Sequence, residues 1–195
     1  MTQLLEKTTD LRMIYHDRTW EQFKLIQKGF EGLPGVRLSY YEGMIELLMP
    51  GQDHELFGCV IRALLFNFFA QKGIFFLPSG SMTQEREGKA SVQADKSFCI
   101  GSRKPIPDLS IEVIFTSGSE SKLAVYQALG VLEVWFWQDG VLRLHHLRES
   151  GYERIERSEL PGLEDLDIEL LKRCILIAET DPGEAARVFQ REILQ

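Results

Sequence analysis

The segment from Ile106 to Leu129 holds three residues that could do chemistry together, two acids and a lysine. Asp108 and Glu112 lie in a run rich in β-branched residues that predicts a strand over 108–115, and Lys122 lies near the start of the following helix. Alternation puts both acids on one face of the strand, but four residues of strand separate them by about 13 Å. One metal ion cannot bridge that distance, so Glu112 needs a partner from a neighbouring strand.

Asp95 is the best candidate for that partner. It is a lone acid in a strand-like stretch, 91–100, that leads towards the strand of Glu112. Two carboxylates converging from adjacent strands form a hard oxygen site of the kind that holds Mg²⁺ or Mn²⁺, and the backbone carbonyl of Val113 could add a ligand. The alternative is that both acids are exposed on edge strands.

Lys122 lies in the first turn of its predicted helix, where the helix dipole disfavours a cation. Aimed at a water or phosphate beside the metal, its charge would stabilise the transition state or help to activate water. The alternative is a solvated surface lysine.

Three further residues are candidates for supporting roles. Glu46 stands in an otherwise apolar strand, where a carboxylate is costly to bury unless it binds a metal or is paired, for example to an arginine. His54 opens the next helix and could point to the same rim, or it could be structural. Asp108 could join the site, or it could bond a turn amide after Pro107.

The elements that must position these residues follow from periodicity and turn signals. Their order predicts one α/β (α+β) domain over residues 1–195, a mixed β-sheet flanked by helices, with an N-terminal helix and hairpin and two C-terminal helices. The expected helices are a Thr19-capped helix ending by Gly32, 54–72 capped by Asp53, 119–130, 166–179 and 182–194 capped by Asp181. The expected strands are 36–41, 44–49, 74–78, 82–87, 91–100, 108–115, 131–137, 141–147 and an edge strand at 152–157. Residues 1–17 have no clear period and could form a loose arm or a short strand around 12–15.

Composition limits the class of protein. Apolar residues make up 44% and charged residues 26%, which is typical of a globular chain. Arg62 and Asn67 interrupt the longest apolar run, which is too short and polar for a membrane span, and no secretory signal is visible. Three scattered cysteines predict reduced thiols in a cytoplasmic protein, and no zinc cluster can be assembled.

The net charge of −7 argues against a broad nucleic-acid surface, although a local basic rim can coexist with an acidic total. Glycine-rich phosphate loops and a GxSxG elbow are absent from the sequence. The Trp135-Phe136-Trp137 run favours core packing over a base-stacking platform.

The segments YYEGMIELLMPGQDHE, ADKSFCI and IPDLSIEVIFTSGSESKLAVYQALGVLEVWFW, in this order and spacing, resemble the Uma-two family. That family is a bacterial branch of the PD-(D/E)xK restriction-endonuclease-like superfamily. The resemblance covers Thr19 to Leu147. It implies a restriction-endonuclease-like fold, with a metal-binding aspartate on one strand and an acid-x-lysine on the next.

Carried over by position, Asp95 matches the first aspartate, although Ala94 stands where a proline is expected. Glu112 matches the acid, but Ile114 stands where the lysine is expected. The resemblance implies that the following helix supplies the lysine instead, here Lys122.

The resemblance extends to two of the supporting candidates. Glu46 corresponds to the acid of the family's GxIEL segment, and His54 corresponds to its histidine.

The leading hypothesis is an endonuclease that uses Mg²⁺ or Mn²⁺ to hydrolyse phosphodiester bonds of nucleic acid, expected to be DNA. Asp95 and Glu112 would hold the ion and Lys122 would stabilise charge. The rival is a nuclease-like scaffold that does not cut and binds nucleic acid or protein, which the acidic charge and Ile114 favour. A third reading is an oligomerisation module, such as a homodimer formed through the exposed hairpin.

Overall fold

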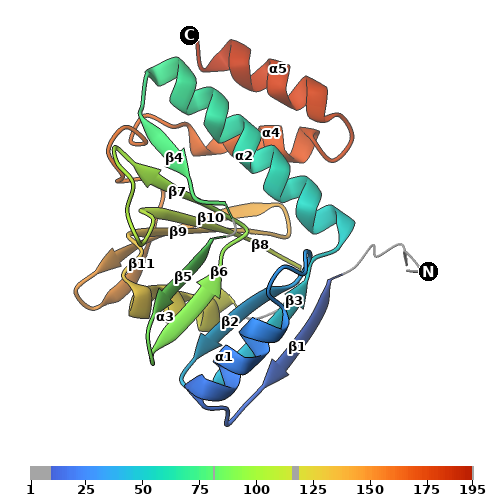
Figure 1. Cartoon of the computed structure of the whole chain (residues 1–195). Helices are drawn as coiled ribbons and strands as arrows, with labels where there is room; N and C mark the ends of the chain where they lie inside the picture. Colours follow the sequence, from blue (N-terminus) through green and yellow to red (C-terminus); the bar gives the residue numbers. More distant parts are fainter. Residues whose placement is uncertain (1–9, 81, 116–118, 195) are drawn as a thin grey trace.

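The computed structural model of the chain describes residues 10–80, 82–115 and 119–194. In this part of the chain, eleven strands form two sheets and five helices pack on and between them (Figure 1). In chain order the elements are β1 (Leu11–Tyr15), α1 (Trp20–Gly29), β2 (Arg37–Tyr41), β3 (Met44–Met49), α2 (Gln52–Lys72), β4 (Phe76–Pro78), β5 (Thr83–Arg86), β6 (Ala90–Gln93), β7 (Lys96–Ile100), β8 (Leu109–Ile114), α3 (Ser119–Leu129), β9 (Glu133–Gln138), β10 (Val141–Arg148), β11 (Gly151–Ile155), α4 (Ile168–Ile177) and α5 (Pro182–Glu192).

The strands divide into a five-stranded antiparallel sheet, ordered β1-β3-β2-β6-β5, and a six-stranded sheet, ordered β11-β10-β9-β8-β7-β4. Within the second sheet β8 and β9 run parallel, and the other neighbouring pairs are antiparallel. The prediction of one mixed sheet was therefore incomplete, because only the second sheet is mixed.

The predicted strand 91–100 was wrong, because β6 and β7 belong to different sheets. The chain passes between the sheets at Ala94 and Asp95, both buried. No glycine or proline marks the break, so the sequence pattern predicts one continuous strand across it. Asp95 consequently lies at the junction of the sheets and not inside a strand.

Both predicted hairpins are confirmed, and their turns show why. Glu42 and Gly43 join β2 to β3 with φ values of 45° and 81°, and Asp139 and Gly140 join β9 to β10 with φ values of 51° and 73°. Two successive residues at positive φ give the twist that antiparallel strands need in a two-residue turn.

The predicted helix caps are confirmed for α1 and α5 and wrong for α2. Thr19 and Gln22 form the expected capping box, and Asp181 caps α5. The N-cap of α2 is Gly51, whose backbone is extended, at φ −81° and ψ 179°, so the first helical residue is Gln52. The helix therefore begins earlier, and Asp53 falls in its first turn, where an acid suits the dipole.

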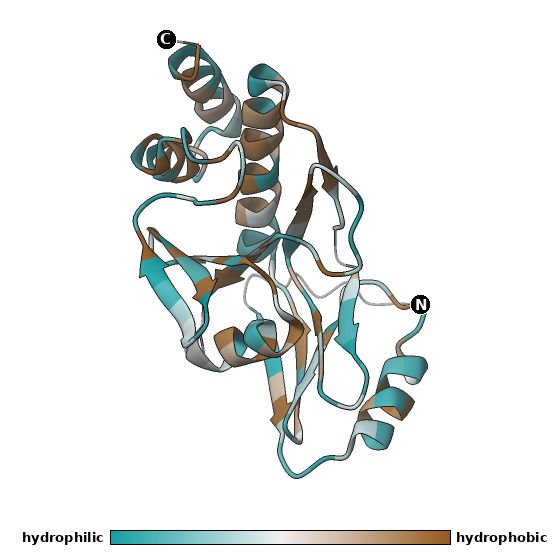
Figure 2. Cartoon of the chain, turned by 90° about the vertical axis from the view of Figure 1, so that its left-hand side faces the viewer, coloured by the Kyte–Doolittle hydropathy of each residue, from teal (hydrophilic) through white to brown (hydrophobic). Residues whose placement is uncertain are grey.

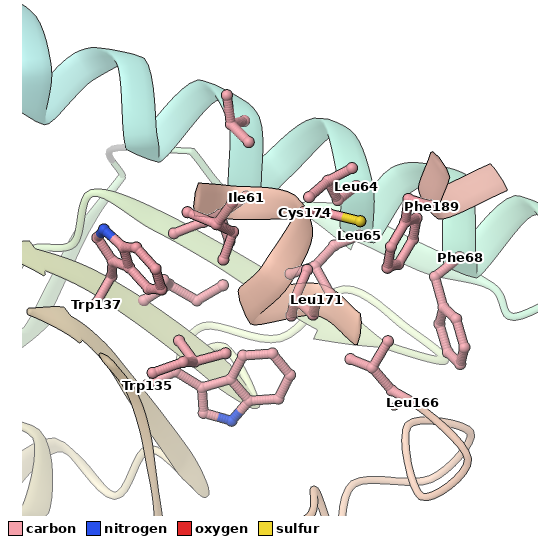
Figure 3. Close-up of a cluster of buried hydrophobic side chains, with 14 of the residues drawn as sticks. Ile61, Leu64, Leu65, Phe68, Trp135, Trp137, Leu166, Leu171, Cys174 and Phe189 are labelled. Atoms are coloured by element: carbon pink, nitrogen blue, oxygen red, sulfur yellow. The ribbon is translucent and has the colours of Figure 1, made fainter. Parts of the chain in front are cut away.

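The largest core lies between the six-stranded sheet and the layer of α2, α4 and α5 (Figure 1). Figure 3 shows Trp135 and Trp137 of β9 beneath Ile61 of α2. Trp135, Phe136 and Trp137 are 0%, 0% and 2% exposed, so the prediction that this run packs in the core is confirmed.

Helix α3 packs between the two sheets, where Val125, Tyr126 and Leu129 share a buried cluster with Val92 of β6 and Phe136 of β9. Helix α1 covers the five-stranded sheet separately and is mostly hydrophilic, whereas α2 is apolar along much of its length (Figure 2). None of the helices in the described ranges is both long enough and apolar enough to cross a bilayer.

Candidate active site

Asp95 and Glu112 meet where β7 runs alongside β8. In this antiparallel pair Lys96 lies opposite Ile111, so Asp95, one residue earlier, comes beside Glu112. The backbone N–H of Val113 donates to Asp95 Oδ2 at 2.6 Å. Both acids are buried, at 2% and 1% exposure. The structure thus brings the two predicted acids together, and it is the Val113 amide, not the carbonyl proposed as a ligand, that contacts Asp95.

Asp95 is held by two cationic side chains. The Arg37 guanidinium donates to Oδ1, and His54 Nε2 lies 2.8 Å from Oδ2. Burial alone would raise the pKa of Asp95. The hydrogen bond from His54 and the charges of Arg37, His54 and Lys122 instead lower it to about 2. Asp95 is therefore ionised at neutral pH.

Glu112 lies between a lysine and a tyrosine on consecutive turns of α3. Lys122 Nζ is 2.5 Å from Oε2, and the Tyr126 hydroxyl donates to Oε1. Burial raises the pKa of Glu112, the charge of Lys122 opposes that rise, and the charge of Asp95 adds to it. The two carboxylates are thus close enough to repel each other.

The positive charge of Lys122 interacts with three acids, Glu112, Asp95 and Glu46. Burial would lower its pKa, but the charges of Glu112, Asp95 and Glu46 together raise it. The ammonium group therefore keeps its proton at neutral pH. Lys122 can stabilise negative charge here, but it cannot act as a general base.

Glu46 joins the cluster through the shared lysine. Its Oε1 lies 3.9 Å from Lys122 Nζ, while its Oε2 accepts from Arg12 Nη2 at 2.5 Å and Nε at 2.8 Å. The buried carboxylate is thus paired to an arginine, as one of the two readings of the sequence expects, and it also faces the candidate site.

His54 is buried at 1% exposure and bridges two aspartates. Its Nδ1 lies 2.9 Å from Asp10 Oδ2, and its Nε2 faces Asp95. The backbone N–H of Gly51 donates to the other Asp10 oxygen at 2.8 Å. Burial would lower the pKa of His54, but Asp95 and Asp10 raise it, so the protonated ring can donate to both carboxylates.

Asp108 lies apart from this cluster. Its Oδ2 accepts from the backbone N–H of Ile100 at 2.7 Å, and Lys104 Nζ lies 2.7 Å from both carboxylate oxygens. These bonds fix the loop between β7 and β8. Asp108 is thus held by the amide of Ile100 and by Lys104, and not by a turn amide after Pro107.

Comparison with known proteins identifies the fold around these acids. The family profile of Uma2, described as "Putative restriction endonuclease", matches residues 20–174. The chain belongs to the Uma2 family. The structure of the Uma2 chain resembles the crystal structure of a putative nuclease of DUF820 from Anabaena variabilis, with a TM-score of 0.55 and 16% identity over 80% of this chain and 98% of that one. No curated protein matches the sequence.

The predicted restriction-endonuclease-like fold is thereby confirmed for this Uma2 chain. Its nuclease-like character is supported at the level of the family.

Four residues of the cluster were missed from the sequence: Asp10, Arg12, Arg37 and Tyr126. Tyr126 follows Lys122 by four residues, so the two share a helix face, and that spacing was an available signal. Asp10 and Arg12 come from a segment without a clear period, which offered no signal.

The donor chemistry of the Uma2 site fits a hard cation. Among the residues that the structure describes, no three His, Cys, Asp or Glu side chains are grouped as a metal site. Asp95 and Glu112 nevertheless place two buried, mutually repelling carboxylates side by side. Mg²⁺ is often bound by only one or two protein carboxylates, with water and phosphate oxygens as the remaining ligands.

Proposed function

We propose that this protein is a nuclease that depends on Mg²⁺ or Mn²⁺ and hydrolyses phosphodiester bonds of nucleic acid, with DNA as the expected substrate. The observation that carries the proposal is the convergence of Asp95 from the β6–β7 junction, Glu112 from β8 and Lys122 from α3. The nuclease character of the Uma2 family supports the reaction class.

Asp95 and Glu112 would hold the cation, and the Val113 carbonyl is a further candidate ligand. When bound, such an ion neutralises charge on the scissile phosphate and activates the attacking water. The repulsion between the two carboxylates favours a positive charge between them.

Lys122 would stabilise the negative charge that develops on phosphate oxygens in the transition state. Its raised pKa suits this role, because the lysine stays charged while it faces Glu112. Tyr126 and Arg37 would act as positioning residues, since each donates to an oxygen of one of the two acids.

The placement of Ile114 supports a relocated lysine. Ile114 is 6% exposed and packs in the apolar cluster under α3, so an ammonium group at this position would be buried among apolar side chains. Lys122 reaches Glu112 from α3 without that cost.

A non-cutting scaffold is the second candidate, and a specific observation favours it. Each oxygen of Asp95 and Glu112 already accepts a hydrogen bond from a protein group. A cation would therefore compete with Lys122 and Arg37 for these oxygens.

The experiment compares wild type with Glu112→Gln and Lys122→Met on supercoiled, linear and single-stranded DNA and on RNA, with Mg²⁺, Mn²⁺ or EDTA. Cleavage that needs the ion and falls by about a hundredfold or more in both variants is expected. Glu169→Gln, on α4, is the control and should cut like wild type.

Calorimetry with Mn²⁺ separates the two candidates. A nuclease site should bind Mn²⁺ in wild type and lose that binding in Glu112→Gln. Wild type that neither binds Mn²⁺ nor cuts any of these substrates would leave the scaffold as the better account.

A further inference from the structure

One exposed carboxylate at the edge of the site is shared by two sheltered cations. Glu55, in the first turn of α2, has a side chain 47% exposed, whereas the side chains of Arg37 and Lys96 are each 12% exposed. Arg37 Nη2 donates to Glu55 Oε1 at 2.5 Å, and Lys96 Nζ lies 3.7 Å from Oε2. Lysine and arginine usually keep their charged ends in water, so two sheltered cations beside a more exposed carboxylate are an unusual arrangement.

The fold makes room for Lys96 in this position. A Cβ atom on Gly58, three residues after Glu55 in α2, would lie 3.1 Å from both Cε and Nζ of Lys96. Glycine inside a helix costs about 1 kcal/mol relative to alanine. The bare backbone of Gly58 lets the end of Lys96 lie against the helix beside Glu55.

The same two cations adjoin the candidate catalytic acids. The other terminal nitrogen of Arg37 contacts Asp95, and Lys96 is the next residue in the chain. Asp95, Glu112 and Glu46 are all buried, so Glu55 is the exposed acid next to them. An anion that binds Arg37 and Lys96 therefore has to compete with the Glu55 carboxylate.

We propose that Arg37 and Lys96 form a phosphate-binding subsite beside the acids, and that the Glu55 carboxylate occupies the place of a backbone phosphate. A nucleic-acid phosphate displaces Glu55 from the two cations when it binds. A planar guanidinium and an ammonium group are the usual partners of phosphate oxygens, and the exposed Glu55 side chain can turn into solvent. The choice of nucleic acid as the ligand rests on the proposed function.

The test measures binding of a short fluorescently labelled DNA duplex by anisotropy, in EDTA and over a range of salt concentrations. Glu55→Gln removes the competing charge but keeps the shape, so its affinity should rise roughly threefold to tenfold. Lys96→Met keeps the stem beside Gly58 but loses the charge. Its affinity should fall by a similar factor, and the slope of log K against log salt should be shallower by about one.

Matched controls come from an ion pair on α4, which contributes no residue to the cluster. Lys172 Nζ lies 3.0 Å from Glu169 Oε2. Glu169→Gln and Lys172→Met change the net charge by the same amounts as the two test variants. They should bind DNA like wild type, and thermal unfolding should show that all four variants are folded.

Three results would overturn the subsite. Glu55→Gln could bind no more tightly than Glu169→Gln, Lys96→Met could keep the salt slope of wild type, or wild type could fail to bind both DNA and a matching RNA. Because EDTA prevents ion-dependent cleavage, the binding measurement does not depend on whether the protein cuts DNA in the nuclease assay. If the variants shift the DNA affinity but the protein never cuts, the subsite stands and the proposed nuclease reaction is wrong. If the protein cuts but the variants do not shift the affinity, the reaction stands and the subsite is wrong.

Discussion

At the scale of single residues, the two buried central acids have pKa values that are shifted in opposite directions. Cationic neighbours lower the pKa of Asp95, whereas burial and the charge of Asp95 raise the pKa of Glu112. Lys122 faces both and stays charged. The pair therefore keeps one carboxylate firmly ionised next to one that binds a proton more readily than usual.

Acid is expected to destabilise the protein through Asp95. Because the pKa of Asp95 falls from 3.8 to about 2 on folding, its ionised form stabilises the fold above pH 3.8, and this contribution is lost as the pH falls through 2. The loss amounts to roughly 2 kcal/mol. Urea unfolding at several pH values measures it.

The control for this pH dependence is Asp95→Asn, whose free energy of unfolding should fall less steeply between pH 3.8 and 2. Glu112 has a raised pKa, so below pH 3.8 it is mostly protonated in both states and adds little slope. Equal slopes in wild type and Asp95→Asn would contradict the assignment of Asp95 as an ionised, stabilising acid.

At the scale of elements, α2 serves both the core and the site. Phe57, Ile61 and Leu65 pack into the large apolar cluster, while His54 and Glu55 in its first turn belong to the polar one. A change on this helix can therefore affect stability and ligand binding independently.

Gly58→Ala should separate these two effects. Alanine favours the helix by up to about 1 kcal/mol, and the flexible end of Lys96 can move away from the new Cβ, so the free energy of unfolding should rise. The displaced Lys96 should weaken DNA binding in the same direction as Lys96→Met. Urea unfolding and anisotropy measure the two effects.

Gly29→Ala is the matched control, since Gly29 lies in α1 with open space around its Cβ position. It should stabilise by a similar or smaller amount and leave DNA affinity unchanged. A Gly58→Ala variant that binds DNA like wild type would show that the position of Lys96 is unimportant.

Elements were predictable from sequence where the local signal was complete. The turns with positive φ at Gly43 and Gly140 define the two hairpins within a few residues. The capping box at Thr19 defines the start of α1 in the same way. The crossing at Asp95 was not predictable. The chain passes from one sheet to the other within two residues that carry no turn signal, and only the three-dimensional packing of the sheets reveals this crossing.

The candidate site, too, was only partly predictable from the sequence. Asp95 and Glu112 could be paired because Asp95 immediately precedes β7, which runs alongside the strand of Glu112. Arg37 and Arg12 could not be placed, since they lie on strands of the five-stranded sheet and contact acids 58 and 34 residues away in sequence.

At the scale of the whole molecule, another buried acid ties the C-terminal part to the six-stranded sheet. Glu133 is fully buried, and its Oε2 accepts from Trp135 Nε1 at 2.9 Å and Ser158 Oγ at 2.8 Å. Its Oε1 accepts from the Glu159 N–H at 2.6 Å and lies 3.1 Å from His146 Nδ1. These partners are mostly neutral donors that hold the 158–159 segment, so Glu133 is structural.

Glu133→Gln should therefore destabilise the fold. The amide replaces one acceptor oxygen with a donor group, which leaves buried donors unsatisfied at a cost of about 2 to 4 kcal/mol. Urea unfolding measures the change. Glu153→Gln removes an acid that is 63% exposed and should cost under about 0.5 kcal/mol. Equal stabilities of the two variants would show that the Glu133 network is unimportant.

The short crossing between the sheets has a thermodynamic consequence. Asp95 follows a strand of one sheet and precedes a strand of the other, and it contacts the second sheet through Val113. Arg37 of the five-stranded sheet also contacts Asp95, so the sheets cannot separate without losing this ion pair, and the complete cluster around Asp95 and Glu112 exists only in the assembled molecule. A ligand that binds this pair selects the folded state, and the midpoint of thermal unfolding should then depend on the ligand's concentration.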